Sequence, residues 1–199
     1  MRELSLHILD VLENALEAGA TEVELEIDED LHTDRLAITV RDNGRGMDSQ
    51  TAQRALDPFF TTRTTRHVGL GLPLFAAAAR RCEGDLSLES APGRGTVVTT
   101  TFRHSHLDRA PLGDVTGTLL AFLLSERGAG LRFVYHHRVN GRSFDLDTSA
   151  IRAELEDIPL SHPLVREWLH DFVAEGEAEL ASAYYGVTAQ TQRSEGENR

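Results

Sequence analysis

The hexapeptide Asp42-Asn43-Gly44-Arg45-Gly46-Met47 (DNGRGM) decides how this chain is interpreted. It directly follows residues 36–41, in which apolar and polar side chains alternate as in a half-buried β-strand. Its two glycines permit a sharp turn with positive φ and let a ligand come close to the main chain. An ionised Asp42 only accepts hydrogen bonds, so it suits a ligand amino group such as N6 of adenine. Because Asp-Asn-Gly also occurs in ordinary turns, the flanking segments must decide.

The segment before this turn predicts a helix and two strands. Residues 4–18 have the period of an amphipathic helix with one apolar stripe and one polar side. The stripe consists of Leu4, Ile8, Val11, Leu12 and Ala15, and the polar side of His7, Asp10, Asn14 and Glu17. Asp10 and Asn14 are four residues apart, so they lie one turn apart on a shared face. Residues 22–27 alternate like residues 36–41, which predicts an antiparallel pair of strands.

The segment after the turn predicts a loop, a second helix and two more strands. A short helix over residues 49–55 precedes PFFTT (residues 58–62), and residues 61–67 lack an apolar period, which predicts a mobile loop. GLGL (residues 69–72) begins a helix that continues to residue 82, and strands are expected at 85–90 and 95–102. This order of elements predicts the α+β class: a two-layer sandwich with helices on one face of a mixed sheet.

A shift in composition at residues 103–114 predicts a boundary. We expect a first domain over residues 1–104, a small α+β domain over 105–186 and a disordered polar tail over 187–199. Within the second domain the patterns predict helices at 114–125, 149–155 and 163–183 and strands at 131–139 and 142–147, with an Asn140-Gly141 hairpin turn. Its sequence carries no ligand motif, which leaves regulatory contacts or homodimerisation as its expected roles.

Composition excludes several classes of partner. A formal net charge of −12 argues against binding to nucleic acid or to an anionic membrane surface, both of which attract clustered Lys and Arg. No apolar run approaches the roughly 20 residues of a membrane span, and Met1-Arg2-Glu3 lacks the pattern of a signal peptide. The single cysteine, Cys82, cannot form an internal disulfide. We therefore expect a cytoplasmic protein.

Together these motifs resemble those of the GHKL superfamily, whose members share the Bergerat ATP-binding fold and include gyrase, MutL-type proteins, sensor histidine kinases and anti-sigma-factor serine kinases. LDVLENALEAGA (residues 9–20) is similar to the family's N box and DNGRGM to its first glycine box. PFFTT and GLGL are similar to the F box and second glycine box of histidine kinases, and GRGT (residues 93–96) to the closing strand. Each motif is weak alone, but five in the right order are specific. The sequence around the N box is more similar to MutL, and the sequence from PFFTT to GRGT is more similar to the histidine kinases.

The resemblance implies ATP and Mg²⁺ as cofactors. It makes Asn14 the magnesium ligand, and an amide oxygen is a suitable hard donor. It places Asp42 on adenine N6 and the GLGL amides, at a helix N-terminus, on the triphosphate. Thr96 would support the adenine site through its hydroxyl, while Arg63 and Arg66 are either phosphate contacts or solvated loop charges. The full set of nucleotide contacts that it implies is Asn14, Asp42, Gly44, Gly46, Met47, Thr62, Arg63, Gly69, Leu70, Gly71, Leu72 and Thr96.

Asp10 departs from the family pattern at the expected general base. Relatives that hydrolyse ATP commonly carry Glu four residues before the Asn, and Asp is one methylene shorter. A displacement of about an ångström can cost on the order of 100-fold in rate. Asp10 is therefore either a weak general base or a partner of the metal, and strong hydrolysis is not expected. Glu13 is turned about 100° away from Asn14 and is a poorer candidate.

The phosphoacceptor is the second departure. Sensor histidine kinases carry their target His on a helical hairpin before the N box, and this hairpin is expected to be missing here. HLDRAPL (residues 106–112) is something like the kinase H box, although it follows the ATPase and its acid is displaced by one residue. His106 is therefore a candidate phosphoacceptor, in cis or from another copy, with an ordinary linker as the favoured alternative. His136 and His137 are neighbours on a predicted strand, so they are not expected to bind one metal together.

Three functions follow from this interpretation. The favoured one is a Mg²⁺-dependent, histidine-kinase-like protein that transfers the γ-phosphoryl group of ATP to an unidentified partner protein, or hydrolyses ATP weakly. The alternative is an ATP-switched binding module of MutL or anti-sigma type, in which an ordered loop over residues 61–68 engages a partner without transfer. The third, a degenerate fold that no longer binds ATP, is disfavoured because the glycines and Asp42 are intact.

Overall fold

The computed structural model describes residues 2–57 and 70–196. The helices are α1 (Leu4–Glu17), α2 (Ser49–Arg54), α3 (Gly71–Arg81), α4 (Val115–Leu123), α5 (Thr148–Leu155) and α6 (Pro163–Gly196), with a 3₁₀ turn at Gly128–Gly130. The strands are β1 (Glu22–Asp30), β2 (Arg35–Asp42), β3 (Leu86–Ser90), β4 (Thr96–Arg103), β5 (Arg132–Val139) and β6 (Arg142–Asp147). None of the helices in these ranges has the length and apolar character needed to span a lipid bilayer.

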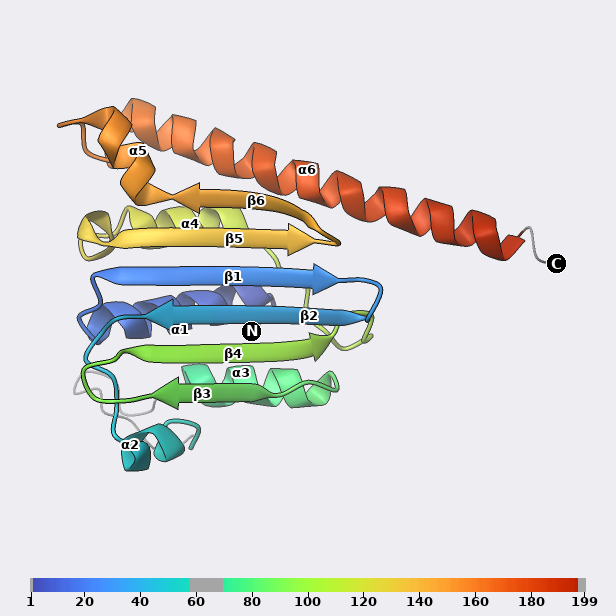
Figure 1. Ribbon diagram of the computed structural model, residues 1–199, viewed down its shortest axis with the longest axis horizontal. Coiled ribbons are helices and arrows are strands. Elements are labelled where there is room, and N and C mark those ends of the chain that lie inside the picture. The colour runs from blue at the N-terminus through green and yellow to red at the C-terminus, as the bar shows by residue number, and fades with distance from the viewer. Residues whose placement is uncertain (1, 58–69, 197–199) are drawn as a thin grey trace.

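The strands form one mixed sheet in the order β3-β4-β2-β1-β5-β6. All neighbours are antiparallel except β1 and β5, which run parallel. Figure 1 shows α1, α3 and α4 behind this sheet, with α6 along its β6 side. The predicted α+β class and the predicted pairing of the first two strands are thus confirmed.

The core lies between the sheet and these helices because the inward residues of each strand are apolar. Val23, Leu25 and Ile27 of β1 have no exposed surface, and the intervening residues of that strand face the other way. Leu4 and Leu12 of α1 are equally buried against them. Each such side chain contributes about 1.5–3 kcal/mol relative to an exposed one. The apolar face of the sheet and the apolar faces of the helices therefore pack against each other in a single core.

His7 does not lie on the polar side of α1, as the sequence predicted, but is 4% exposed. Its ring stacks on Phe75 of α3, with 4.9 Å between ring centroids and 6° between planes. Since His7 is four residues before Val11, it borders the apolar stripe, and α3 covers that border. Burial lowers the pKa of His7 to about 4, so the ring is neutral and packs as an aromatic.

The carboxy-terminal strands do not form a sheet of their own but extend the first one. β5 pairs with β1 from Glu22↔Arg132 to Glu29↔Val139, and Phe133 and Tyr135 of β5 are fully buried in the common core. A two-stranded hairpin is marginal alone, so β5 and β6 gain from joining the free edge of β1. The boundary at residue 104 stays a prediction, but the sheet is continuous across it. α6 also continues to Gly196, through most of the tail predicted to be disordered.

The sheet face without helices is lined by cross-strand ion pairs. Acidic side chains of β1 and β6 alternate with basic ones of β2 and β5, and the pairs are Arg41–Glu24, Arg132–Glu22, Arg132–Asp147, Arg138–Glu26 and His136–Asp145. Each exposed pair contributes about 0–1 kcal/mol, so their main effect is to keep this face hydrated. They also account for the glutamates that alternate along β1.

A buried polar network ties α6 to the sheet at the end of β1. Glu29 accepts one hydrogen bond from His104 at 2.7 Å and one from His137 at 3.1 Å. His137 also contacts Glu177 of α6 at 2.9 Å, and Tyr135 donates to the same carboxylate at 2.7 Å. His136 faces the opposite side and pairs with Asp145, as the strand geometry predicted. Within residues 2–57 and 70–196, no group of three or more His, Cys, Asp or Glu side chains is arranged to hold a metal ion.

This network is expected to make stability depend on pH. Burial alone would lower the pKa of His137, but hydrogen bonds and charge from Glu177 and Glu29 raise it to about 9 from its ordinary 6.5. The stabilisation is then fully present below about pH 6.5 and lost as pH rises through 9. Burial alone would raise the pKa of Glu29, but hydrogen bonds from His104 and His137 lower it to about 2 from 4.5, so its contribution holds above pH 4.5 and is lost as pH falls through 2.

Urea unfolding at fixed pH measures this effect. We expect the free energy of unfolding to fall by on the order of 2 kcal/mol between pH 6.5 and 10. His137→Gln removes the titrating group from the network, so its unfolding free energy should be lower at neutral pH and should lose much of the alkaline decline. An identical alkaline decline in the variant would show that other groups cause it.

Candidate nucleotide-binding site

Asp42 is the last residue of β2, where it lies opposite Val23 of β1 and Thr96 of β4. Its carboxylate accepts the backbone N–H of Gly44 at 2.8 Å, and a second hydrogen bond from the backbone of Thr96. Partial burial raises the pKa of Asp42, and these two N–H donors oppose that shift because they stabilise the ionised form. The strand end thus holds one carboxylate in a fixed direction, as the recognition of a ligand amino group requires.

The two glycines of DNGRGM let the turn pack closely against the protein itself. A Cβ atom on Gly44 would lie 2.7 Å from the Cβ of Ala18, at the end of α1. Gly46 has a φ of 65°, and a Cβ there would lie 2.0 Å from the carbonyl oxygen of Ala91 in the β3–β4 loop. From the sequence, both glycines are expected to let a ligand come close to the main chain. The structure shows an additional requirement, since the turn touches two other segments.

Asn43, whose type alone predicts only a turn residue, fixes the turn to the start of β1. Its side-chain oxygen accepts the N–H groups of Thr21 and Glu22 at 2.8 and 2.9 Å, and its amide donates to the Thr21 hydroxyl at 2.9 Å. Arg45 adds a second connection, because its guanidinium donates to the carbonyl of Glu17 at the end of α1 at 2.9 Å. These contacts join segments about 20 residues apart, so local sequence carries no direct signal for them.

Ser90 is a second residue that sequence reasoning missed. Its hydroxyl accepts the N–H of Met47 at 2.9 Å, contacts the Thr96 hydroxyl at 3.0 Å and donates to the carbonyl of Gly95 at 2.9 Å. The predicted contact residues Met47 and Thr96 are therefore linked through one side chain. One signal was available in the sequence. Ser90 follows Leu86 and Leu88 at alternate positions of β3, so a polar residue stands where an apolar one would continue the inward face.

Asp10 and Gly71 meet where α1 crosses the start of α3. A Cβ atom on Gly71, the first residue of α3, would lie 3.2 Å from the Cβ and 3.3 Å from one carboxylate oxygen of Asp10. Asn14 lies one turn further along α1, and both side chains are partly exposed. Because Ala18 is one more turn along, about 6 Å from Asn14, the helix also reaches the DNGRGM turn. The structure thus brings Asp10, Asn14, the start of α3 and the Asp42 turn to one end of the molecule.

Some predicted residues lie elsewhere. PFFTT, with Thr62, and the loop residues Arg63, Arg66 and Gly69 lie outside the described residues. His106 is placed at the other end of the sheet, since its ring lies 3.9 Å from Glu83, which follows α3, and the neighbouring Arg103 pairs with Asp34, just before β2. The eight residues of β2, about 23 Å, therefore separate this end from Asp42. This arrangement does not favour transfer to His106 within one copy, and transfer between copies stays a prediction.

The family of the chain follows from a comparison with known proteins. Residues 2–106 match the family described as histidine kinase-, DNA gyrase B- and HSP90-like ATPases, and this match covers slightly more than half of the chain. The chain belongs to this family. The resemblance inferred from the motifs is thereby confirmed, and the chain contains a histidine-kinase-like ATP-binding domain.

Individual members of the ATPase family support this assignment. The sensor protein kinase FleS of Pseudomonas aeruginosa is 46% identical over 92 residues, which are 46% of this chain and 23% of FleS. The signal transduction histidine-protein kinase AtoS of Escherichia coli is 34% identical over 93 residues, 46% of this chain and 15% of AtoS. The sensor histidine kinase YxdK of Bacillus subtilis is 31% identical over 104 residues, 50% of this chain and 32% of YxdK. The chain thus spans less than a third of each of these relatives.

Proposed function

We propose that this chain is a Mg²⁺-dependent, kinase-like protein that transfers the γ-phosphoryl group of ATP to a partner protein and hydrolyses ATP only weakly. The observation that carries the proposal is the contact between Asp10 and the first turn of α3. It puts a carboxylate beside the backbone amides that would receive a triphosphate. The names of FleS, AtoS and YxdK, all kinases, favour transfer over a nucleotide switch.

Binding would use the two ends of the site. The carboxylate of Asp42 would accept the adenine amino group, while the amides of Leu70 and Gly71 would face the phosphates at the positive end of α3. Asn14 and Asp10 present oxygen donors from one face of α1, and both are partly exposed, which leaves space for water ligands. This donor set fits Mg²⁺, which prefers a few protein oxygens together with waters and phosphate oxygens. A bound Mg²⁺ would neutralise charge on the phosphates during transfer.

The acceptor must be brought to this end of the molecule. Asp10 would orient the accepting group and take its proton, which an Asp does less well than a longer Glu held at the same place. His106 is separated from the site by the length of the sheet, so the proposal assigns the acceptor to a partner. Weak hydrolysis then follows, because a water molecule in place of the acceptor is poorly aligned.

Variants of Asp10 test this role. We expect Asp10→Asn to lower both transfer and phosphate release by about 10- to 100-fold while the dissociation constant for ATP changes by less than about threefold. Asp10→Glu should raise phosphate release, because the longer side chain reaches the nucleophile. Steady-state phosphate release and calorimetric titration with ATP and Mg²⁺ measure the two quantities. Asp28→Asn, on the sheet face without helices, is the control, and equal losses in Asp28→Asn and Asp10→Asn would contradict a specific role.

The fate of the labelled γ-phosphate tests the function itself. The protein is incubated with γ-³²P-ATP and Mg²⁺, alone and with proteins that it retains in the presence of a non-hydrolysable ATP analogue. Transfer predicts label on a retained protein, lost in Asp10→Asn, with little free phosphate. Release of free phosphate without labelled protein would make the chain a hydrolase, and nucleotide-dependent retention without either product would make it a binding switch.

A further inference from the structure

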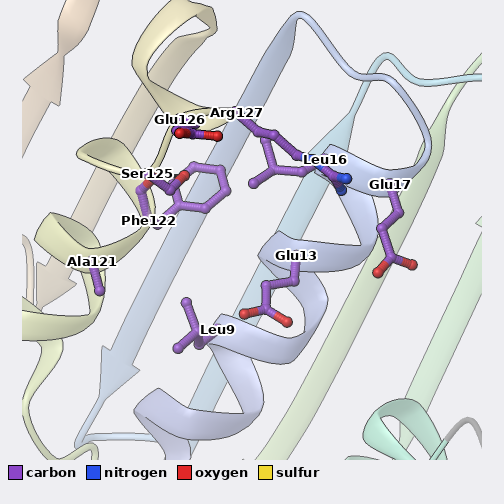
Figure 2. A pocket seen from close by; sticks show the side chains of 9 residues that line it. All are labelled: Leu9, Glu13, Leu16, Glu17, Ala121, Phe122, Ser125, Glu126 and Arg127. Atoms are coloured by element: carbon purple, nitrogen blue, oxygen red, sulfur yellow. Dashed lines mark hydrogen bonds between the residues drawn. The ribbon is translucent and has the colours of Figure 1, made fainter. Parts of the chain in front are cut away.

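A pocket of about 330 Å³ lies on the other flank of α1, in the groove between α1 and α4 (Figure 2). The residues of α1 and α4 that line it face each other across this groove, and the segment after α4 closes one end. They are Leu9, Glu13, Leu16, Glu17, Ala121, Phe122, Ser125, Glu126 and Arg127. The pocket shares no residue with the candidate nucleotide site: Asp10 lies against Gly71 of α3, whereas Glu13 lines the pocket beside α4.

The lining combines an apolar floor with an acidic rim. Leu9, Leu16 and Phe122 belong to or pack against the hydrophobic core, so they present aliphatic and aromatic surface at the bottom of the groove. Two carboxylates, from Glu13 and Glu126, stand against one guanidinium, from Arg127. Within the described residues, the side chains of Glu13 and Glu126 make no hydrogen bond or ion pair. The rim therefore carries excess negative charge that the chain itself does not neutralise.

A long basic side chain matches both parts of this lining. An arginine buries its methylene stem along apolar surface and keeps its charged head at the polar edge. Its planar guanidinium can donate to two carboxylates at once. In Figure 2 the chain's own Arg127 extends from the α4 side toward Leu16. The net charge of −12 also attracts a basic partner over longer distances.

We propose that the pocket between α1 and α4 is a docking site for an arginine side chain from a basic segment of a partner protein. The proposal does not depend on phosphoryl transfer, because the pocket and the nucleotide site use different residues. It does place the partner on the helix that carries Asp10 and Asn14, since Glu13 lies between them in sequence. A partner that docks here would thus contact the flank of α1 that faces α4, next to the face that carries Asp10 and Asn14.

Titration of the whole ¹⁵N-labelled chain with N-acetyl-arginine amide tests the site, with N-acetyl-citrulline amide as the uncharged analogue of the same shape. Arginine should cause saturable shifts of the amide resonances of residues 9–17 and 121–127, and citrulline should bind at least about fivefold more weakly. The doubly substituted Glu13→Gln, Glu126→Gln chain should lose at least about fivefold in affinity for the arginine probe. Glu89→Gln, an exposed glutamate on β3, should bind like the unchanged chain.

Three results would overturn the proposal. Equal affinities for arginine and citrulline would show that the acidic rim does not select a charge. Shifts confined to β1 and β5 would show that arginine binds only the sheet face without helices. Unchanged affinity in the double variant, with its native amide spectrum retained, would remove the carboxylates from the site. N-acetyl-lysine amide distinguishes a requirement for the guanidinium fork from one for charge alone, and lysine binding as tightly as arginine would refute the fork.

Discussion

Asp42→Asn is expected to abolish detectable ATP binding, a loss of at least about 100-fold in affinity. The carboxylate only accepts hydrogen bonds, whereas the amide of Asn presents an NH₂ group that would face the amino group of adenine. The substitution removes a hydrogen bond to a charged group and leaves two donors facing each other. Together these changes cost about 3 kcal/mol, which corresponds to a loss of about 100-fold in affinity. Calorimetric titration with ATP in the presence of Mg²⁺ measures the change.

The variant should still fold, which makes the result interpretable. The Asn oxygen can keep the hydrogen bond that Asp42 accepts from the backbone N–H of Gly44. Circular dichroism and the urea midpoint should therefore stay close to those of the unchanged chain. Asp28→Asn removes the same charge elsewhere on the sheet and should bind ATP normally. Retained ATP affinity in Asp42→Asn would contradict the assignment of the adenine contact.

Gly46→Ala is expected to destabilise the fold by about 3 kcal/mol and to weaken ATP binding strongly. Alanine at a positive φ costs about 1–2 kcal/mol, and its Cβ would also lie 2.0 Å from the carbonyl oxygen of Ala91. Because a backbone atom cannot move aside like a side chain, the turn must shift away from the β3–β4 loop. That shift would displace Met47 from the hydroxyl of Ser90.

Gly93→Ala is the matched control for this substitution. Gly93 has a φ of 72°, close to that of Gly46, but a Cβ there would meet nothing within 4 Å. Gly93→Ala should therefore lower the free energy of unfolding only by the cost of alanine at positive φ, about 1–2 kcal/mol. Its affinity for ATP should be nearly unchanged. Urea unfolding of both variants separates the cost of the positive φ from the cost of the close approach to Ala91, and calorimetry measures their affinity for ATP. Equal losses of stability in the two variants would show that the contact with Ala91 is unimportant.

Most elements of this fold could be predicted because their signals are local. The alternation in β1 and β2 and the helical period in α1 depend on neighbours within four residues. The Asn140-Gly141 turn between β5 and β6 was equally clear, since both residues have the positive φ that such a turn needs. The glycines of DNGRGM predicted a turn at that position, and the glycines of GLGL predicted the start of α3. Most predicted ends differ by one or two residues from the observed ones, but β1 continues three residues beyond its predicted end, to Asp30, and α6 continues to Gly196.

The contacts that assemble the site could not be predicted in the same way. Parallel pairing of β5 with β1 joins residues more than 100 positions apart, and no local pattern selects that partner. Histidine is usually a polar surface residue, so the sequence predicts His7 on the exposed side of α1. It is buried because α3 places Phe75 against its ring. Ser90 and Asn43 act through hydrogen bonds to distant backbone groups. The sequence thus indicated the residues of the candidate ATP site, while the side chains that hold its turn in place emerge only in the folded chain.

The parallel pairing of β1 and β5 has a consequence for how this protein is made on the ribosome. The partner of β1 is synthesised about a hundred residues later, which at about 5–20 residues per second leaves that edge of the nascent strand uncovered for about 5–20 seconds. Exposed strand edges invite pairing between neighbouring chains. Glu22, Glu24 and Glu26 repel the same residues of another nascent chain on a polysome until the basic residues of β5 arrive.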